Sequence, residues 1–202
     1  MRSLWRLATD EGGQNLVEFA LLLPVLMYIL MGILQFGLIF AAYITINNAS
    51  REGARWGSLY VYTTASCSGT CKASNDTDRQ DGVLDRIVQG RGILNIPASG
   101  SNSNFDTGSS WATGTVATDC AIQTPTPSSA VKRGDVTICY TLPSGVSDSD
   151  SRRGQYMEVT AWYHQNVFVP LLDLFLPDDT SKSAATQAQW LRLPGRVTVV
   201  IN

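Results

Sequence analysis

The sequence predicts an α+β protein with a long N-terminal transmembrane helix and a small exported domain. We expect that domain to contain a short helix and an antiparallel sheet of about three or four strands. Three observations support this class. The 28 residues from Phe19 to Ile46 include no Asp, Glu, Lys, Arg or His. Ser, Thr, Gly, Asn and Asp then become frequent, and the last third of the chain alternates apolar and polar residues, as half-buried strands do.

The apolar run is long enough to cross a membrane as a helix. At 1.5 Å per residue it would extend about 42 Å, whereas a hydrocarbon core is roughly 30 Å thick, so the helix should tilt or project beyond the bilayer. It is also longer than the apolar centre of a secretory signal peptide. Gln35 and Thr45 are its only distinctly polar residues, and Pro24 predicts a bend with a free carbonyl that favours a partner helix.

The chain divides into three segments on these grounds. Residues 1–13 form a charged leader that ends in Gly12 and Gly13, which we expect to stop any helix from running back from the span. Residues 14–57 form the transmembrane helix, and residues 58–202 form an extracytoplasmic α+β domain with long loops rich in Ser, Thr and Gly.

The end of the helix carries a mixture of small and charged residues. Ala49, Gly53 and Gly57 recur every four residues, a pattern that lets another helix or a sheet approach closely. Arg51 and Arg55 share a face and Glu52 lies beside them. The alternative is a frayed helix end with arginines that reach back to the membrane surface.

A second, shorter helix is expected near residue 85. Residues 63–81 read as a loop, and Val83, Leu84, Ile87 and Val88 then follow at helical spacing. Asp81 is the expected N-cap, and Gly90 or Gly92 the expected stop. Residues 98–114 and 123–130 read as exposed loops.

Strand patterns appear late in the chain and should pack on this helix. The expected strands are 135–142, 155–169 and 196–201, the last of them after a turn at 193–195. Residues 168–177 are apolar but bracketed by prolines, which predicts a hydrophobic loop or a short helical turn.

All four cysteines follow the apolar run, in a region of exported character. Disulfides persist outside the cytoplasm, so we expect the N-terminus inside and the C-terminal domain outside. Four cysteines allow three pairings, of which Cys67 with Cys71 and Cys120 with Cys139 is favoured. A zinc site is the rival, but the CSGTC spacing does not suit zinc ligands and the chain has a single histidine.

Charge and motifs argue against several classes of function. A net charge of -2 without basic clusters does not favour nucleic-acid binding. The usual nucleotide, hydrolase and zinc-protease motifs are missing, so we expect no enzyme, no cofactor and no metal site. His164 is predicted to be a half-exposed strand residue. The acidic runs at 75–82 and 147–151 fit solvated turns and a helix cap better than calcium loops.

Glu18 is a lone carboxylate at the start of the apolar run. Insertion of an acid at the centre of a membrane costs about 2.5–3.5 kcal/mol, so such a residue is a functional candidate, although it could simply mark the interfacial end of the helix. A cut between Gly13 and Gln14 would create an α-amino group whose charge could pair with Glu18 in the same chain or in a neighbour. Such a cut would give the carboxylate a role.

Gly13, the following QNLV, Glu18 and Phe19 resemble the class III signal of type IV pilin-like proteins, in which a prepilin peptidase cuts after the glycine. Residues 13–55 more specifically resemble TadE-like proteins, the minor pilins or pseudopilins of the Flp (tight adherence) pilus. The resemblance rests on the GxxLVEFALxLP opening that includes Pro24, on Phe36-Gly37, and on the ASREGAR close with Arg51, Glu52, Gly53 and Arg55.

The resemblance implies a function in assembly. It implies cleavage after Gly13, a single-pass protein of the cell (inner) membrane, other pilin subunits and the peptidase as partners beside membrane lipid, and possible incorporation in the pilus. An exported part of roughly 145 residues is large for a major Flp subunit and indicates a minor component. Two alternatives stay open: a membrane-anchored binding or adhesion module, and an exported enzyme with a dispersed site.

Overall fold

The computed structural model describes residues 11–62, 71–90, 92, 94, 104–113, 120–121, 125–169, 175–182 and 189–202. Two helices are present in these ranges, α1 (Glu11–Ser58) and α2 (Lys72–Gln89). The strands are β1 (Ala112–Thr113), β2 (Ser129–Arg133), β3 (Val136–Thr141), β4 (Tyr156–Asn166) and β5 (Trp190–Val200). They form one five-stranded antiparallel sheet in the order β1-β2-β3-β4-β5. The α+β class is confirmed, with five strands where about three or four were expected.

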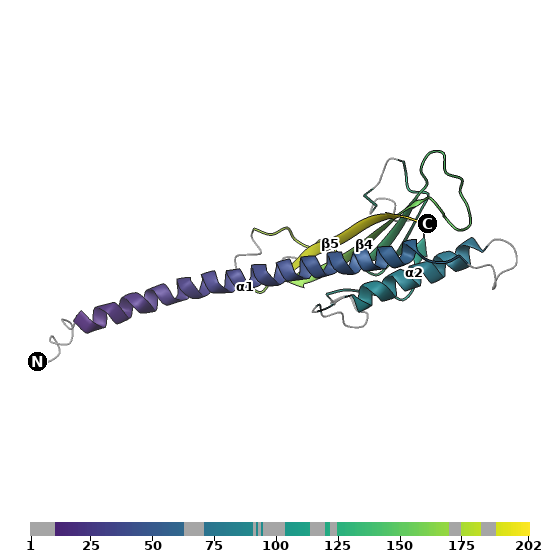
Figure 1. Cartoon of the computed structure of the whole chain (residues 1–202). Coiled ribbons are helices and arrows are strands. Elements are labelled where there is room, and N and C mark those ends of the chain that lie inside the picture. The colour runs from purple at the N-terminus through teal and green to yellow at the C-terminus, as the bar shows by residue number, and fades with distance from the viewer. Residues whose placement is uncertain are drawn as a thin grey trace, which may run out of the picture.

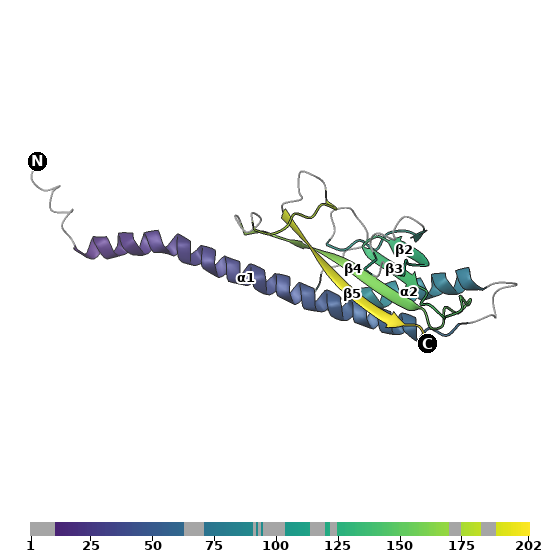
Figure 2. The same cartoon turned by 90° about the horizontal axis from the view of Figure 1, so that it is seen from above.

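The first helix is one continuous element of 48 residues that projects far beyond the rest of the molecule (Figure 1). It begins at Glu11, before Gly12 and Gly13, so the expectation that this glycine pair stops the helix was wrong. The backbone also remains helical through Pro24, and Figure 2 shows the N-terminal half curving gently rather than breaking. Residues 1–10 of the predicted leader lie outside the described residues.

The second helix begins ten residues earlier than predicted: its N-cap is Cys71 rather than Asp81, and its first residue is Lys72. Its first half is polar, yet Asn75, Asp76 and Arg79 are buried there. Asp76 accepts hydrogen bonds from Arg152 at 2.8 Å and from Arg79 at 3.4 Å. The polar residues are therefore buried by mutual pairing, and a search for apolar periodicity does not detect such a helix.

Asp81 lies inside α2 and is not its N-cap. Its carboxylate accepts hydrogen bonds from the Trp111 indole and from Arg133, both at 2.8 Å. The residues 75–82 thus belong to a packed helix, and the reading of this run as solvated turns with a helix cap was wrong. The helix ends at Gln89, with Gly90 as its C-cap as predicted.

Three strands differ from the sequence expectation, and the first of them, β1, lies inside residues 98–114, which were expected to form a loop. The short strand β2 starts at Ser129, inside a stretch expected to be a loop. The strand β5 starts at Trp190 and runs straight through residues 193–195, which were wrongly expected to form a turn. Because β5 is the edge of the sheet, Pro194 can lie in it without interrupting the pairing with β4.

The core lies between the sheet and the two helices. The C-terminal half of α1 and the adjacent α2 pack together, and α1 also covers β4 and β5. Side chains from all of them are fully buried, including Ile46, Val83, Ile87, Ile138 and Met157. The predicted Cys120–Cys139 disulfide is present, attached to β3. Cys71 is also disulfide-bonded, whereas Cys67 lies outside the described residues.

Candidate membrane and assembly helix

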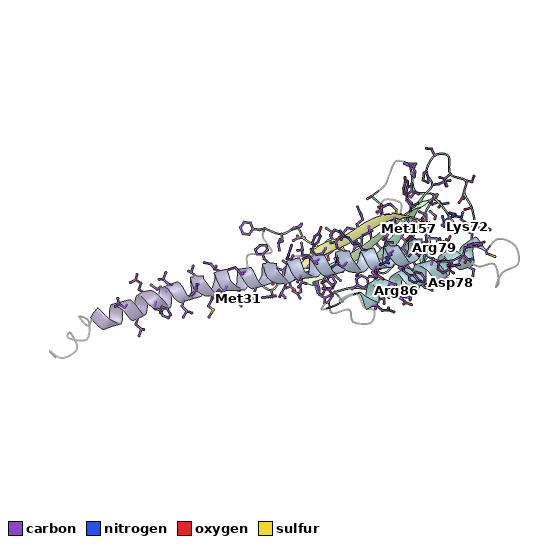
Figure 3. The ribbon with its side chains drawn as sticks, in the orientation of Figure 1. Met31, Lys72, Asp78, Arg79, Arg86 and Met157 are labelled. Carbon is purple, nitrogen blue, oxygen red and sulfur yellow. A yellow bond between two sulfur atoms is a disulfide. The ribbon has the colours of Figure 1, made fainter. Side chains whose placement is uncertain are left out.

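The N-terminal half of α1 has no covering from the rest of the described chain. Every residue from Asn15 to Met31 is exposed, including Phe19 and Leu26. In Figure 3 the side chains of this half, Met31 among them, point outward on all sides, whereas Met157 lies between the sheet and the helix. Among the described helices, α1 is long and apolar enough to cross a membrane. Its exposed apolar surface is suited to contact with lipid or with other helices.

Gln35 marks the point at which packing begins. It is fully buried although its neighbours Leu34 and Phe36 are exposed. Its side-chain amide donates to the carbonyl of Asn166, the last residue of β4, at 3.1 Å. Its Oε1 accepts from the backbone N–H of Phe168 at 3.4 Å. The polar residue inside the apolar run therefore fastens the helix to the end of the sheet.

The apolar run continues past this junction. The stretch from Phe19 to Leu34 extends about 24 Å, somewhat less than the thickness of a hydrocarbon core, and has no partner within the described residues. Beyond Gln35, Ala42 and Ile46 are buried against the domain, whereas Phe36, Leu38 and Phe40 remain exposed. The apolar run therefore includes residues of both the uncovered and the packed half.

Glu18 lies in the uncovered half, with its side chain exposed. Among the described residues it has neither an ion-pair partner nor a hydrogen-bond partner. The backbone is helical on both sides, so residue 14 precedes Glu18 by one helical turn, about 6 Å along the axis. Positions four residues apart share a helix face, and an amino group at residue 14 would lie within reach of this carboxylate.

Phe19 directly follows Glu18 in the same half, and Pro24 lies between one and two helical turns further along. An apolar hollow next to the proline is lined by Phe19, Leu22, Leu23, Val25, Leu26 and Ile29. A hollow of this composition suits an apolar side chain of another helix.

The C-terminal half of α1 is packed through its small residues. A methyl group on Gly53 would lie 2.8 Å from Ile87 Cγ1 and 3.1 Å from the carbonyl oxygen of Val83. One on Gly57 would lie 2.6 Å from Met157 Cε. The small-residue stripe thus receives α2 and the sheet, as the pattern predicted, and the frayed-end alternative does not apply.

The charged members of the same motif point outward. Arg51, Glu52 and Arg55 are exposed, while Gly53 and Ala54 between them are buried. Arg51 follows Gln35 by about 24 Å along the helix axis. These charges therefore lie at the far end of the packed half, well away from the uncovered half.

Comparison with known protein families identifies this helix. The model of the family described as TadE-like protein matches residues 13–55. This segment is TadE-like. The match begins at Gly13, ends at Arg55 and covers about a fifth of the chain. No curated protein and no solved structure matches the chain.

The TadE-like segment thus contains both halves of α1: the uncovered helix with Glu18 and the small residues that receive α2. The uncovered half of α1 was recognisable from its apolar composition as a helix that could cross a membrane. The function of Gln35 was not, although its position as one of two distinctly polar residues in the run was a usable signal.

His164 was predicted to be half-exposed and is instead 2 % exposed. Its Nδ1 is hydrogen-bonded to Asp179, and its Nε2 lies 3.0 Å from Asp135 Oδ1. Burial acts to raise the pKa of Asp179, but hydrogen bonds from Ser181 and His164 outweigh it and hold that pKa below its ordinary value. The alternating pattern of β4 did not predict burial because the segment 175–182 covers this position.

Proposed function

We propose that this protein is a minor pilin or pseudopilin that takes part in assembly of a Flp (tight adherence) type pilus, after a prepilin peptidase removes residues 1–13. The observation that carries the proposal is the TadE-like match, which begins at Gly13 and includes an uncovered apolar helix. A helix without intramolecular partners is suited to packing among the helices of other pilin subunits.

Glu18 is the proposed assembly residue. Cleavage after Gly13 would leave a positive α-amino group on Gln14, one helical turn before Glu18. In a low-dielectric environment an unpaired carboxylate is costly, so Glu18 would pair with this group in its own chain or in a neighbouring subunit. A charge pair of this kind fixes the axial step between helices where apolar packing alone would let them slide.

The proposed role is structural rather than catalytic. The one histidine is buried between two carboxylates, an arrangement that fastens the segment 175–182 to the sheet. The proposed location is the cell (inner) membrane, with the N-terminus cytoplasmic and the packed domain outside.

The test combines N-terminal sequencing with substitution of Glu18. Protein from the native host should begin at Gln14, and the Glu18→Ala and Glu18→Gln variants should enter the membrane normally but co-purify poorly with other pilin subunits. Glu18→Asp keeps the charge and should retain part of the assembly. Glu52→Ala removes an exposed acid from the packed half of the same helix and is the matched control.

Normal pilus formation by the Glu18→Gln variant would contradict the assembly role. An intact Met1 would contradict processing and would support the second candidate, a membrane-anchored binding module. A groove between α2 and the edge of the sheet favours that candidate, because its lining combines the apolar side chains of Trp111 and Val131 with polar ones that include Gln80 and Ser128.

A further inference from the structure

The end of the sheet that meets Gln35 exposes large apolar side chains. Phe168, two residues beyond β4, is 53 % exposed, and Phe175 is 82 % exposed. Among the neighbouring residues that the structure describes, Val167 and Val169 are buried. Two exposed phenylalanines at one end of a domain require an explanation, because apolar groups of this size are normally removed from water.

Both phenylalanines belong to segments that are fixed to the sheet. The N–H of Phe168 donates to the Gln35 side chain on α1. Downstream of Phe175, buried Asp179 is hydrogen-bonded to His164 of β4 and accepts from the Ser181 N–H at 3.0 Å. Lys182 lies over the ring of Trp190, which pairs with Asn166. Polar contacts at Phe168 and downstream of Phe175 therefore attach both segments to the rest of the domain.

The position of this end along α1 places it at a membrane boundary. A helix needs about 20 residues to cross a hydrocarbon core, and counting from Phe19 this reaches Leu38, past Gln35. The face of α1 away from the sheet remains apolar and exposed at Phe36, Leu38 and Phe40. A membrane that covers these residues on one face of α1 has its surface next to the end of the sheet on the opposite face.

The residues around the two phenylalanines have the composition of a membrane interface. Lys182 stacks on Trp190, and the guanidinium of Arg192 lies 3.7 Å from the centre of the Trp162 ring. Tryptophan beside lysine or arginine is characteristic of the headgroup region, where rings stay near the acyl chains and charges reach the water.

From these observations we infer that Phe168 and Phe175 form an apolar collar that inserts into the lipid of the leaflet facing the domain, beside α1. The collar adds a second lipid contact to that of the helix and so fixes the depth at which the helix enters the bilayer. The inference rests on α1 spanning the membrane, which is part of the proposed function, but it requires neither cleavage after Gly13 nor pilus assembly.

The experiment measures lipid contact at three positions of the full-length protein. The variants Leu26→Cys, Phe175→Cys and Val61→Cys are each labelled with an environment-sensitive fluorophore. They are then reconstituted in phosphatidylethanolamine and phosphatidylglycerol vesicles that contain acyl-chain nitroxide lipids as quenchers. Val61 is the matched control, because it is apolar, 82 % exposed like Phe175, and lies beyond the opposite end of α1. Labelling of the unsubstituted chain gives the background.

Quenching at positions 26 and 175 should exceed quenching at position 61 several-fold. If position 26 is quenched but position 175 is quenched no more than position 61, the collar is overturned. The membrane helix is then still supported. Absence of quenching at both 26 and 175 would overturn the helix and the collar together. Equal quenching at all three positions would also overturn the collar, since lipid contact would then be unspecific.

Discussion

The two halves of α1 have similar apolar composition and opposite surroundings. From Asn15 to Leu34 side chains are exposed around the helix, whereas from Gln35 onward one stripe is buried against α2 and the sheet. The buried stripe comprises Gln35, Ala42, Ile46, Ala49, Gly53 and Gly57. The apolar run passes from one half into the other without a break, so hydropathy alone does not show where the change occurs.

Small residues on one face and the polar residue Gln35 distinguish the packed half of α1 from the uncovered half. Lipid accepts bulky apolar side chains in every direction, and the uncovered half has them in every direction. Close packing against a sheet and a second helix requires small residues on one face, and Ala49, Gly53 and Gly57 provide them in the packed half. The same helix is thus built for two environments, and three pairs of substitutions test that division.

The largest expected effect comes from truncating one apolar residue in each half. Ile46 is fully buried, and Ile46→Ala should lower the free energy of unfolding of the packed domain by about 2–5 kcal/mol. Leu26 is exposed, and Leu26→Ala should change it by no more than about 0.5 kcal/mol. Denaturant unfolding of the full chain in detergent micelles, followed by tryptophan fluorescence, measures both. Equal losses would remove the distinction between the halves.

A smaller effect is expected from adding bulk at a glycine in each half. Gly53→Leu places a side chain against Ile87 and the Val83 carbonyl, and should cost about 1–3 kcal/mol. Gly32, in the uncovered half, has nothing within 4 Å of an added Cβ, so Gly32→Leu should leave the stability of the domain within about 0.5 kcal/mol. The same unfolding measurement compares them. Tolerance of leucine at position 53 would show that α2 does not pack closely on α1 in solution.

Much of this arrangement could be predicted from residue patterns. The long helix followed from the absence of charge, the small-residue stripe from its four-residue spacing, and the Cys120–Cys139 disulfide from cysteines placed near strand patterns. Strand β3 followed from alternation and strand β4 from its β-rich composition. These features depend on local composition or on short-range periodicity, which a single sequence carries in full.

The errors share a different physical cause, which is that distant residues determine the structure. The first half of α2 is polar because Arg152, far along the chain, pairs with Asp76 there. Residues 193–195 remain in a strand because an edge accepts Pro194 and because Gly195 lies against the backbone of Ile46 on α1. His164 is buried by Asp135 and Asp179, which approach it from other segments. The periodicity of one segment carries no information about contacts with distant segments.

Gln35 lies at the boundary between the halves, and its substitution has the smallest expected effect of the three. Gln35→Leu removes two hydrogen bonds to the end of β4 and should lower the free energy of unfolding by roughly 1–2 kcal/mol. It should also speed hydrogen exchange at the Phe168 amide, which loses its acceptor. Gln165 is the matched control, since it is solvent-accessible and donates to the same Asn166 carbonyl at 3.2 Å.

Gln165→Leu should leave both stability and exchange at Phe168 almost unchanged, because water replaces an exposed hydrogen bond at little cost. If the two variants behave alike, Gln35 does not fasten the helix to the sheet, and the boundary between the halves is set by the small residues further along. If Gln35→Leu loosens the end of β4 while Ile46 and Gly53 stay packed, the boundary is fixed by one polar side chain. That outcome would also explain why the apolar run contains a glutamine at this position and nowhere else.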